Sequence, residues 1–287
     1  MDETDFKILR ILSETHNITK TSERVFTTQP AISKRIKMIE DELGSPILLR
    51  SRHGVRFTAE GETVLNRVLR AEKEMQALRA EIASASGKVA GTLRACFSVN
   101  FAVCVLPDVL SVYHQKYPDV KLQISTGLSS ALFRRFQADE FDIAVMRGDF
   151  SWDGISRVLC EEKICFVCSA ENEGLPLSSY SYIQHDTDSS LSAKTNQWIS
   201  ENKIAVNDTE FCADSILTCI ELVKRGIGWS ILPEIVLKDF DGVKKPLRLK
   251  NGEILTRRTV LLSTEDAFCL PQVRAFADEL SAHYAQN

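Results

Sequence analysis

Hydrogen-bonding and basic side chains are concentrated at the start of one predicted helix, in the segment 28-TQPAISKRIKMIEDELG-44. They are Thr28, Gln29, Ser33, Lys34, Arg35 and Lys37. An amide side chain can bond to adenine through two hydrogen bonds, a hydroxyl can serve several bases, and a cation binds guanine or phosphate. Pro30 adds an apolar surface for a thymine methyl group. These residue types favour recognition of DNA, whereas the simpler alternative is a solvated polar face on an ordinary helix pair.

The position of the basic residues supports recognition of an anion. Positive charge near a helix N-terminus opposes the helix dipole and costs roughly 0.3–1 kcal/mol per charge. That cost is offset when phosphate lies against the same end. From Arg24 to Arg56, seven basic residues oppose three acidic ones, although the whole chain carries a net charge of −4. A basic patch on an acidic chain indicates one charged interface.

A second group of basic residues follows in 46-PILLRSRHGVRFT-58. Two short apolar runs flank Arg52 and His53, which predicts a hairpin with a glycine near its tip. Arg50, Arg52 and Arg56 would then reach the phosphates or the minor groove beside the helix.

Short helices must position these side chains. Residues 4–14 and 19–25 are predicted to be helical, the second with Thr19 as its cap. Thr28 is a good N-cap for the following helix, which ends at Gly44. Two short helices joined by a tight turn predict a helix-turn-helix, and the basic hairpin after it is a wing.

A long amphipathic helix is predicted from Thr58, its N-cap, to about Ser84. Apolar residues recur in it at spacings of 4, 3, 4, 3 and 4, which is a heptad seam with charged flanks. The seam consists of Val64, Val68, Ala71, Met75, Leu78 and Ile82. Packing on a globular core is the simpler explanation, but the narrow seam favours pairing with the same helix of a second chain. The sequence therefore predicts a homodimer.

Beyond a small, polar segment at residues 84–88, the pattern changes to strands that alternate with helices. The predicted strands are 92–98, 120–126, 142–147, 164–169, 182–183, 228–232 and 258–263. The predicted helices are 103–116, 130–139, 192–202, 215–225 and 271–284. This alternation indicates an α/β module with a mostly parallel sheet. Its length of about 195 residues is typical of two subdomains.

The ends of these strands supply candidate ligand-binding residues. Helix N-termini at strand ends offer free N–H groups that suit an anion or a polar small molecule. The candidate segments are 98–100, 126–130, Arg147, 185–190 and 226–229. For any single residue, capping of its own helix is an equally good explanation.

The motifs in residues 19–61 together resemble the winged helix-turn-helix of LysR-type transcriptional regulators. They are Glu23-Arg24, Gln29-Pro30-Ala31-Ile32-Ser33, Ile39-Glu40, Leu43-Gly44 and Thr58-Ala59-Glu60-Gly61. The resemblance covers essentially the whole chain, since 141-FDIAVMRG-148 and 226-GIGWSILP-233 look like that family's effector-binding domain. Thr21-Ser22 and Leu48-Leu49 depart from the family's usual Ala-Ala and Phe-Glu, and both changes can be accommodated in packing.

The resemblance implies a multidomain fold with a periplasmic-binding-protein-like α/β module. The implied parts are an all-α winged helix-turn-helix (1–58), a linker and dimerisation helix (59–86), a hinge (87–91) and an effector-binding domain (92–287). The last would divide into subdomain I (about 92–163 plus 265–287) and subdomain II (about 164–264).

The implied function is a sequence-specific transcriptional regulator. It would bind a pseudo-palindromic operator in double-stranded DNA, as a homodimer or a tetramer made of two dimers, under the control of a small-molecule effector. Arg147 and the helix N-termini favour an anionic effector. The expected DNA contacts are Thr28, Gln29, Pro30, Ser33, Lys34, Arg35, Lys37, Arg50, Arg52 and His53. The expected effector contacts are Ser98, Val99, Asn100, Thr126, Gly127, Ser129, Arg147, Asp186, Thr187, Gly228 and Trp229.

Eight cysteines without a secretory leader fit reduced thiols in a cytoplasmic protein. Cys165 and Cys168 form a CxxC on a predicted strand, where positions three apart face opposite ways. Cys212 and Cys219 could share a helical face. We expect these cysteines to act as small apolar residues. A thiol-redox-responsive regulator of the same architecture is the alternative.

We expect no metal, cofactor, enzymatic activity or membrane segment. The histidines lack zinc-ligand spacing, and the P-loop, GxSxG and dinucleotide motifs are absent from the sequence. The most apolar segment, 101–107, is too short to span a bilayer. An α/β enzyme or binding module tethered to DNA is the remaining alternative.

Overall fold

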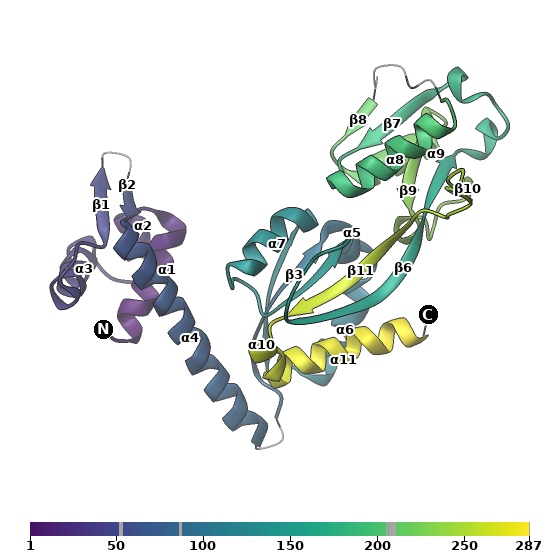
Figure 1. Ribbon diagram of the computed structural model, residues 1–287. Helices are drawn as coiled ribbons and strands as arrows, with labels where there is room; N and C mark the ends of the chain where they lie inside the picture. Colours follow the sequence, from purple (N-terminus) through teal and green to yellow (C-terminus); the bar gives the residue numbers. More distant parts are fainter. Residues whose placement is uncertain (52–53, 86–87, 205, 207–210, 287) are drawn as a thin grey trace. The chain divides into compact units, whose positions relative to one another are not determined.

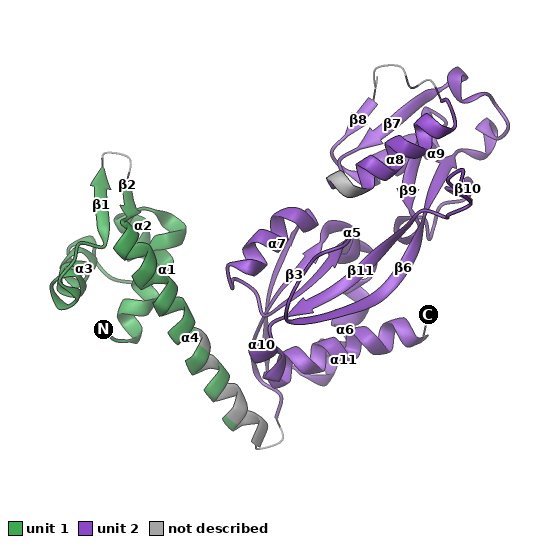
Figure 2. Ribbon diagram, viewed as in Figure 1, with its two compact units in different colours: residues 1–82 green, residues 83–287 purple. Residues whose placement is uncertain are grey.

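The computed structural model of the chain describes residues 1–51, 54–85, 88–204, 206 and 211–286. The chain forms two compact units, residues 1–82 and 83–287, which Figure 2 colours separately. Figure 1 labels the helices and strands of both units.

Three short helices begin the N-terminal unit. They are α1 (Glu3–Thr15), α2 (Ile18–Val25) and α3 (Gln29–Leu43). The side chain of Asn17 caps α2, so the prediction of Thr19 as the cap was wrong by two positions. Thr28 is the N-cap of α3 by backbone conformation, without a capping hydrogen bond from its side chain. Gly44 ends α3 with φ 69°, a left-handed conformation that favours glycine.

The predicted wing is a two-stranded antiparallel hairpin. Its strands are β1 (Leu48–Ser51) and β2 (Gly54–Phe57), and Ser51 lies opposite Gly54. The helix α4 (Ala59–Ala85) follows, with Gly61 N donating to the Thr58 hydroxyl at 2.9 Å, as expected of a cap. A Cβ at Gly61 would lie 2.0 Å from the carbonyl oxygen of Ile47. Glycine therefore lets α4 approach the chain just before the wing.

The heptad seam of α4 divides into two parts. Val68 is 4% exposed and packs in the core that α1, α3 and the wing share, and Val64 packs against the same core. Farther along the helix, Met75, Leu78 and Ile82 are 44%, 49% and 65% exposed. The N-terminal part of the predicted seam is thus covered by its own chain, and its C-terminal part faces outward.

The C-terminal unit consists of two α/β lobes joined by long strands (Figure 1). Lobe I contains β3 (Gly91–Ser98), β4 (Val120–Gly127), β5 (Ile143–Arg147), α5 (Val99–Cys104), α6 (Leu106–Lys116), α7 (Ser129–Gln137), α10 (Glu265–Cys269) and α11 (Pro271–Gln286). Lobe II contains β7 (Ser181–His185), β8 (Phe211–Ala213), β9 (Gly228–Pro233), α8 (Ser189–Glu201) and α9 (Ile216–Lys224). The connecting strands are β6 (Ile155–Cys168) and β11 (Thr256–Ser263), with β10 (Val243–Pro246) beside β6.

The strands follow the order β4-β3-β5-β11-β6-β9-β7-β8. Three strands of each lobe are parallel, β3 with β4 and β5 in lobe I, and β7 with β8 and β9 in lobe II. The prediction of a mostly parallel sheet was wrong, because β6 and β11 pair antiparallel with their neighbours as they carry the chain between the lobes and back. β11, which the sequence-based division assigned to subdomain II, pairs with β5 of lobe I.

One predicted helix is divided in two. The segment 103–116, predicted as a single helix, contains the last two residues of α5 and all of α6, and the two helices meet at Val105. Pro107 lies in the first turn of α6, where its missing N–H costs no hydrogen bond. The short strands β8 and β10 were not predicted, since three or four residues carry too little periodicity.

Candidate functional site

The start of α3 presents a polar surface to solvent. Thr28, Gln29, Pro30, Lys34 and Lys37 are exposed, as the DNA-binding prediction requires. Ser33 lies one turn after Gln29, and its side chain is half-buried. The Nε2 of Gln29 donates a hydrogen bond to the Ser33 hydroxyl at 3.2 Å. This bond orients the amide that was predicted to read a base edge.

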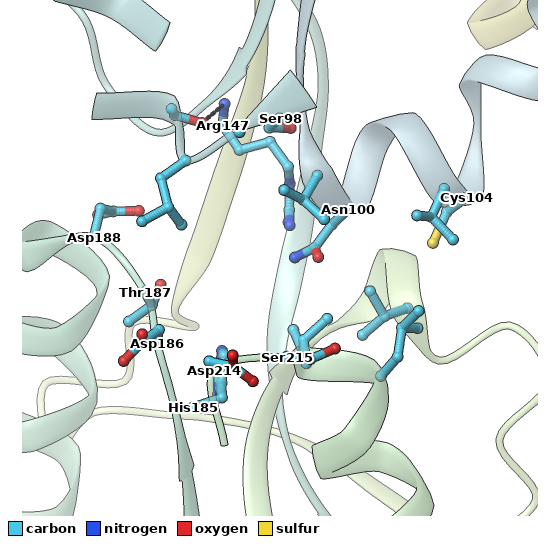
Figure 3. Close-up of a pocket in the computed structure, with 18 of the residues that line it drawn as sticks. Ser98, Asn100, Cys104, Arg147, His185, Asp186, Thr187, Asp188, Asp214 and Ser215 are labelled. Atoms are coloured by element: carbon cyan, nitrogen blue, oxygen red, sulfur yellow. Dashed lines mark hydrogen bonds between the residues drawn. The ribbon is translucent and has the colours of Figure 1, made fainter. Parts of the chain in front are cut away.

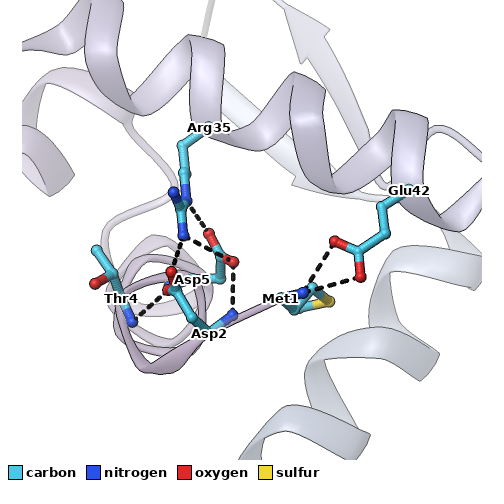
Figure 4. A network of polar contacts seen from close by, with 6 residues as sticks. All are labelled: Met1, Asp2, Thr4, Asp5, Arg35 and Glu42. Atoms are coloured by element: carbon cyan, nitrogen blue, oxygen red, sulfur yellow. Dashed lines mark hydrogen bonds and ion pairs between the residues drawn. The ribbon is translucent and has the colours of Figure 1, made fainter.

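Arg35 has a different role from the one predicted. Its Nε donates to Asp5 Oδ1 at 2.5 Å, and its Nη2 donates to carboxylate oxygens of Asp5 and Asp2 (Figure 4). The hydrogen bond from Arg35 lowers the pKa of Asp2 below its ordinary value. Asp5 is 3% exposed, so Arg35 neutralises a buried carboxylate and links α3 to α1. Its charge is therefore already compensated, which removes the reason to expect it at a DNA phosphate.

The wing carries two exposed arginines within the described residues. Arg50 lies on β1 and Arg56 on β2, and both side chains are exposed. The predicted contacts Arg52 and His53 lie outside the residues that the structure describes.

A cleft with a cavity volume of about 240 Å³ lies between the two lobes of the C-terminal unit (Figure 3). We call it the interlobe cleft. The predicted effector contacts that line it are Ser98, Val99, Asn100, Gly127, Ser129, Arg147, Asp186 and Thr187. The predicted candidate segments also contribute Leu128, Ser130, His185 and Asp188. Residues that sequence reasoning missed are Val103, Cys104, Asp214, Ser215, Ile216, Leu217, Val236 and Arg257.

Three predicted effector contacts do not line the cleft. Thr126 is exposed on β4 outside it. Trp229 is 1% exposed and packs against the ring of Tyr182, with centroids 4.6 Å apart, so it belongs to the core of lobe II. A Cβ at Gly228 would lie 2.3 Å from the carbonyl oxygen of Ser181, which explains this glycine by strand pairing. The predictions for Gly228 and Trp229 were wrong because residues near a strand end can be required for strand pairing and core packing and not for ligand binding.

Arg147 is the most buried cation of the cleft. Its residue exposure is 1%, its Nη2 donates to Glu162, and its backbone N–H donates to the Ser129 hydroxyl at 3.0 Å. Its Nε and Nη1 have no hydrogen-bond partner among the described residues, and neither does the buried hydroxyl of Ser98. Burial lowers the pKa of Arg147, and the positive charge of Arg257 lowers it further. In Figure 3 the Arg147 side chain extends toward Asn100.

Arg257 connects the two lobes. It lies on β11, and its Nη2 donates to the backbone carbonyl of Arg147 at 3.1 Å in lobe I and to the Asp188 carboxylate in lobe II. Its Nη1 donates to the Thr187 hydroxyl at 3.3 Å. Burial lowers the pKa of Arg257, while Asp188 raises it. The sequence signal for Arg257 was a charged residue within an apolar strand, but the sequence did not show that its partner, Asp188, lies in the other lobe.

The two lobes differ in charge where helices begin at the cleft. The first turn of α7 contains no acidic residue, and its N-cap, Leu128, has no side-chain acceptor. In lobe II, Asp188 caps α8 by accepting from Leu191 N at 3.0 Å, and Asp214 precedes the N-cap of α9. Burial, together with the positive charge of Arg257, lowers the pKa of His185 to about 4, so this imidazole is neutral at pH 7.

The cysteines do not form a shared site in the described structure. Cys165 packs in one apolar cluster of lobe II and Cys168 in another, which confirms that they face opposite sides of β6. Cys212 lies on β8 and Cys219 on α9, so the expectation of a shared helical face was wrong. Burial raises the pKa of Cys165 and of Cys219 to about 11, which keeps both as unreactive thiols.

The two units thus combine a helix-turn-helix that has a wing with an α/β module that has an interlobe cleft. Residues 4–62 match the family model for the bacterial regulatory helix-turn-helix protein, lysR family, and residues 86–285 match that for the LysR substrate binding domain. The chain belongs to the LysR family and is a DNA-binding transcriptional regulator with a substrate-binding domain.

Known relatives match along the whole length of the chain. The HTH-type transcriptional regulators YraN and YkuM of Bacillus subtilis (strain 168) are 34% and 32% identical to it, covering 98% and 96% of this chain and 97% and 95% of their own. A full-length, singly substituted OxyR from Pseudomonas aeruginosa has the same fold, with a TM-score of 0.70 at 19% identity, and the match covers 99% of this chain and 94% of that one. CbnR in complex with its target DNA gives a TM-score of 0.64 at 15% identity over 99% of this chain and 100% of that one.

None of the described helices combines the length and the apolarity that crossing a bilayer requires.

Proposed function

We infer that this regulator responds to a small anionic effector bound in the interlobe cleft. The observation that carries the proposal is Arg147, a buried guanidinium whose nitrogens Nε and Nη1 lack a hydrogen-bond partner among the described residues. Leaving buried donors unsatisfied costs about 1–3 kcal/mol each, so a ligand carboxylate that accepts from them would be stabilised. The N-terminus of α7, which begins beside Arg147 at Ser129, adds a favourable dipole.

The cavity volume supports a metabolite rather than a large ligand. About 240 Å³ is below the roughly 300–1,000 Å³ of clefts that hold drug-sized molecules. Arg257 bonds to both lobes, so a ligand that alters its surroundings can favour one arrangement of the lobes over another.

The helix α3 is proposed to read DNA in the major groove, with Gln29 contacting a base edge. Lys34, Lys37 and the wing residue Arg50 would bind phosphates. A winged helix-turn-helix that binds as a dimer requires two half-sites about one helical turn or a multiple apart.

The dimer is proposed to form through the outward-facing part of the seam on α4. Met75, Leu78 and Ile82 are spaced as positions of one helical stripe and are exposed within this chain. Because large exposed apolar groups on one stripe are typical of an interface, Leu78→Glu combined with Ile82→Glu should convert dimers, or tetramers made of two dimers, to smaller species. Light scattering after gel filtration measures this, with Glu74→Ala on the same helix as the control.

The first experiment is selection of bound duplexes from a random DNA pool at near-physiological salt. Enrichment of a two-fold-related motif supports a dimer with base readout, and Gln29→Ala should then reduce affinity for that motif about tenfold or more. Lys37→Ala should weaken binding to all sequences alike. Unselective retention that disappears with added salt would contradict base readout.

The same motif supplies the probe for effectors. Small carboxylic acids should change the affinity or the footprint of the wild-type protein, and this response should disappear when Arg147 is replaced by Met. A response that survives the Arg147→Met substitution would overturn the assignment of the anion site.

A further inference from the structure

The charges around the interlobe cleft are not all positive. Lobe I contributes the Arg147 guanidinium, whereas lobe II contributes the carboxylates of Asp186 and Asp214. In Figure 3, Arg147 lies on one side of the cleft and the two aspartates lie on the other. A simple anion would satisfy the first side and be repelled by the second.

The two aspartates are not neutralised by the pair that Arg257 forms. Asp188 is the third acidic residue of the cleft. Its carboxylate accepts a hydrogen bond from the Arg257 guanidinium and also caps α8, so its negative charge is already compensated. Asp186 and Asp214 are exposed, and they flank the beginnings of α8 and α9. His185, which lies next to Asp186, is neutral and supplies no compensating charge.

The buried donors on the opposite side call for a hydrogen-bond acceptor such as a carboxylate, although Glu162 already pairs with Nη2 of Arg147. Two nitrogens of Arg147, Nε and Nη1, have no hydrogen-bond partner in the described part of the chain, and neither has the hydroxyl of Ser98. Both residues are at least nine-tenths buried and line the cleft. A ligand that satisfies both sides must therefore carry a negative and a positive group.

We propose that the effector is a zwitterion of the α-amino acid class, whose carboxylate binds Arg147 and the N-terminus of α7 and whose ammonium group faces Asp186 and Asp214. This inference rests on the proposed function of the cleft, which it makes more specific. Apolar residues complete the lining, and Val103, Ile216 and Leu217 offer a surface for an aliphatic side chain. The small cavity fits a ligand of this size.

The test compares matched probes on the purified full-length protein. The proteinogenic L-amino acids and the carboxylic acids that lack their amino group are titrated one at a time, with tryptophan fluorescence or calorimetry as the readout. At least one amino acid should bind, and its deaminated acid should bind about tenfold to a hundredfold more weakly, as expected for loss of a charged hydrogen bond.

Two substitutions locate the ammonium group. Asp214→Asn should weaken binding of that amino acid by about tenfold or more, whereas binding of its deaminated acid should not weaken, because a repelling charge is removed. Asp239→Asn, an exposed carboxylate that does not line the cleft, should leave both unchanged. If Asp186 and Asp214 served their helices alone, their replacement would lower thermal stability without changing the ratio of the two affinities, and the proposal would be wrong.

The remaining outcomes separate the two levels of the proposal. Carboxylic acids that bind as tightly as their amino acids would overturn the zwitterion and leave the anion site in lobe I standing. If neither set binds, both the zwitterion and the proposed anionic effector are wrong.

Discussion

Arg147 and Glu162 form a buried ion pair next to the interlobe cleft, with side-chain exposures of 2% and 9%. The other carboxylate oxygen of Glu162 accepts a hydrogen bond from Ile235 N at 2.6 Å. Ile235 belongs to a short 3₁₀ helix (Glu234–Val236) that follows β9 of lobe II. Through Glu162, the candidate anion-binding arginine of lobe I is therefore linked to the chain of the other lobe.

Replacing one member of this pair should destabilise the C-terminal unit. Arg147→Met leaves the Glu162 carboxylate buried without its cation, which should cost about 3–5 kcal/mol. All three tryptophans, Trp152, Trp198 and Trp229, lie in this unit, so urea unfolding followed by tryptophan fluorescence reports it selectively. The double substitution Arg147→Met with Glu162→Gln should recover much of the stability, because no unpaired charge remains. A single variant as stable as the wild type would contradict the burial of the pair.

The stability of the same unit should fall in mild acid because of His185. Burial holds the folded-state pKa of this imidazole at about 4, below its ordinary value of 6.5. Between these values the unfolded chain binds a proton and the folded chain does not, so protonation favours unfolding. The loss should begin near pH 6.5, grow as the pH falls, and reach up to about 3 kcal/mol near pH 4. Urea midpoints across this range measure it, and His185→Gln should flatten the curve. Equal slopes for both proteins would refute the assignment.

Substitutions at the adjacent positions Arg35 and Lys34 should have different effects, one on the stability of the N-terminal unit and the other on DNA binding. Arg35→Ala removes the partner of the buried Asp5, so amide hydrogen exchange should become faster in peptides from α1 and α3. Lys34→Ala should leave exchange unchanged and weaken DNA binding, since this side chain is exposed. Faster exchange in the lysine variant alone would reverse these assignments.

The Arg35 contacts also predict a pH dependence. Since Arg35 lowers the pKa of Asp2, the stabilisation is present above the unfolded-state pKa of this carboxyl and is lost as the pH falls through the folded-state value. Hydrogen exchange of α1 should therefore accelerate below about pH 4 in the wild type, relative to the intrinsic exchange rate, and less so in Asp2→Asn.

Gly61→Ala should destabilise the N-terminal unit although alanine is the better helix former. The added methyl group would lie 2.0 Å from the carbonyl oxygen of Ile47, so α4 or the chain before the wing must move. Overpacking of this kind costs about 1–3 kcal/mol, more than the gain in helix propensity. The neighbouring exposed position gives the control, since Glu62→Ala should change stability by less than about 0.5 kcal/mol. Hydrogen exchange in peptides from α3 and the wing compares the two, and an alanine at residue 61 that stabilises would contradict the close approach.

Sequence alone determined the elements whose signals are local. The cap at Thr58, the left-handed stop at Gly44 and the pairing of β1 with β2 follow from conformational preferences of a few neighbouring residues. The alternation of strands and helices indicated the α/β module for the same reason, and side-chain alternation along a strand correctly separated Cys165 from Cys168. Strand-end segments likewise brought Arg147, Ser129 and Asp186 into the list of cleft residues.

Tertiary structure decided everything that depends on partners distant in the chain. Arg35 looked like a phosphate ligand until Asp5, thirty positions earlier, was found to take its charge. Trp229 and Gly228 were predicted to line the cleft, yet both pair with β7, and Trp229 packs in the core of lobe II. Asp214 carried no local sign of the cleft, and the charge of Arg257 within its strand did not indicate a partner in the other lobe, because the cleft forms where two lobes meet. Local preferences fix which elements form, whereas the pairing of charges and the sharing of a cavity depend on which distant residues the fold brings together.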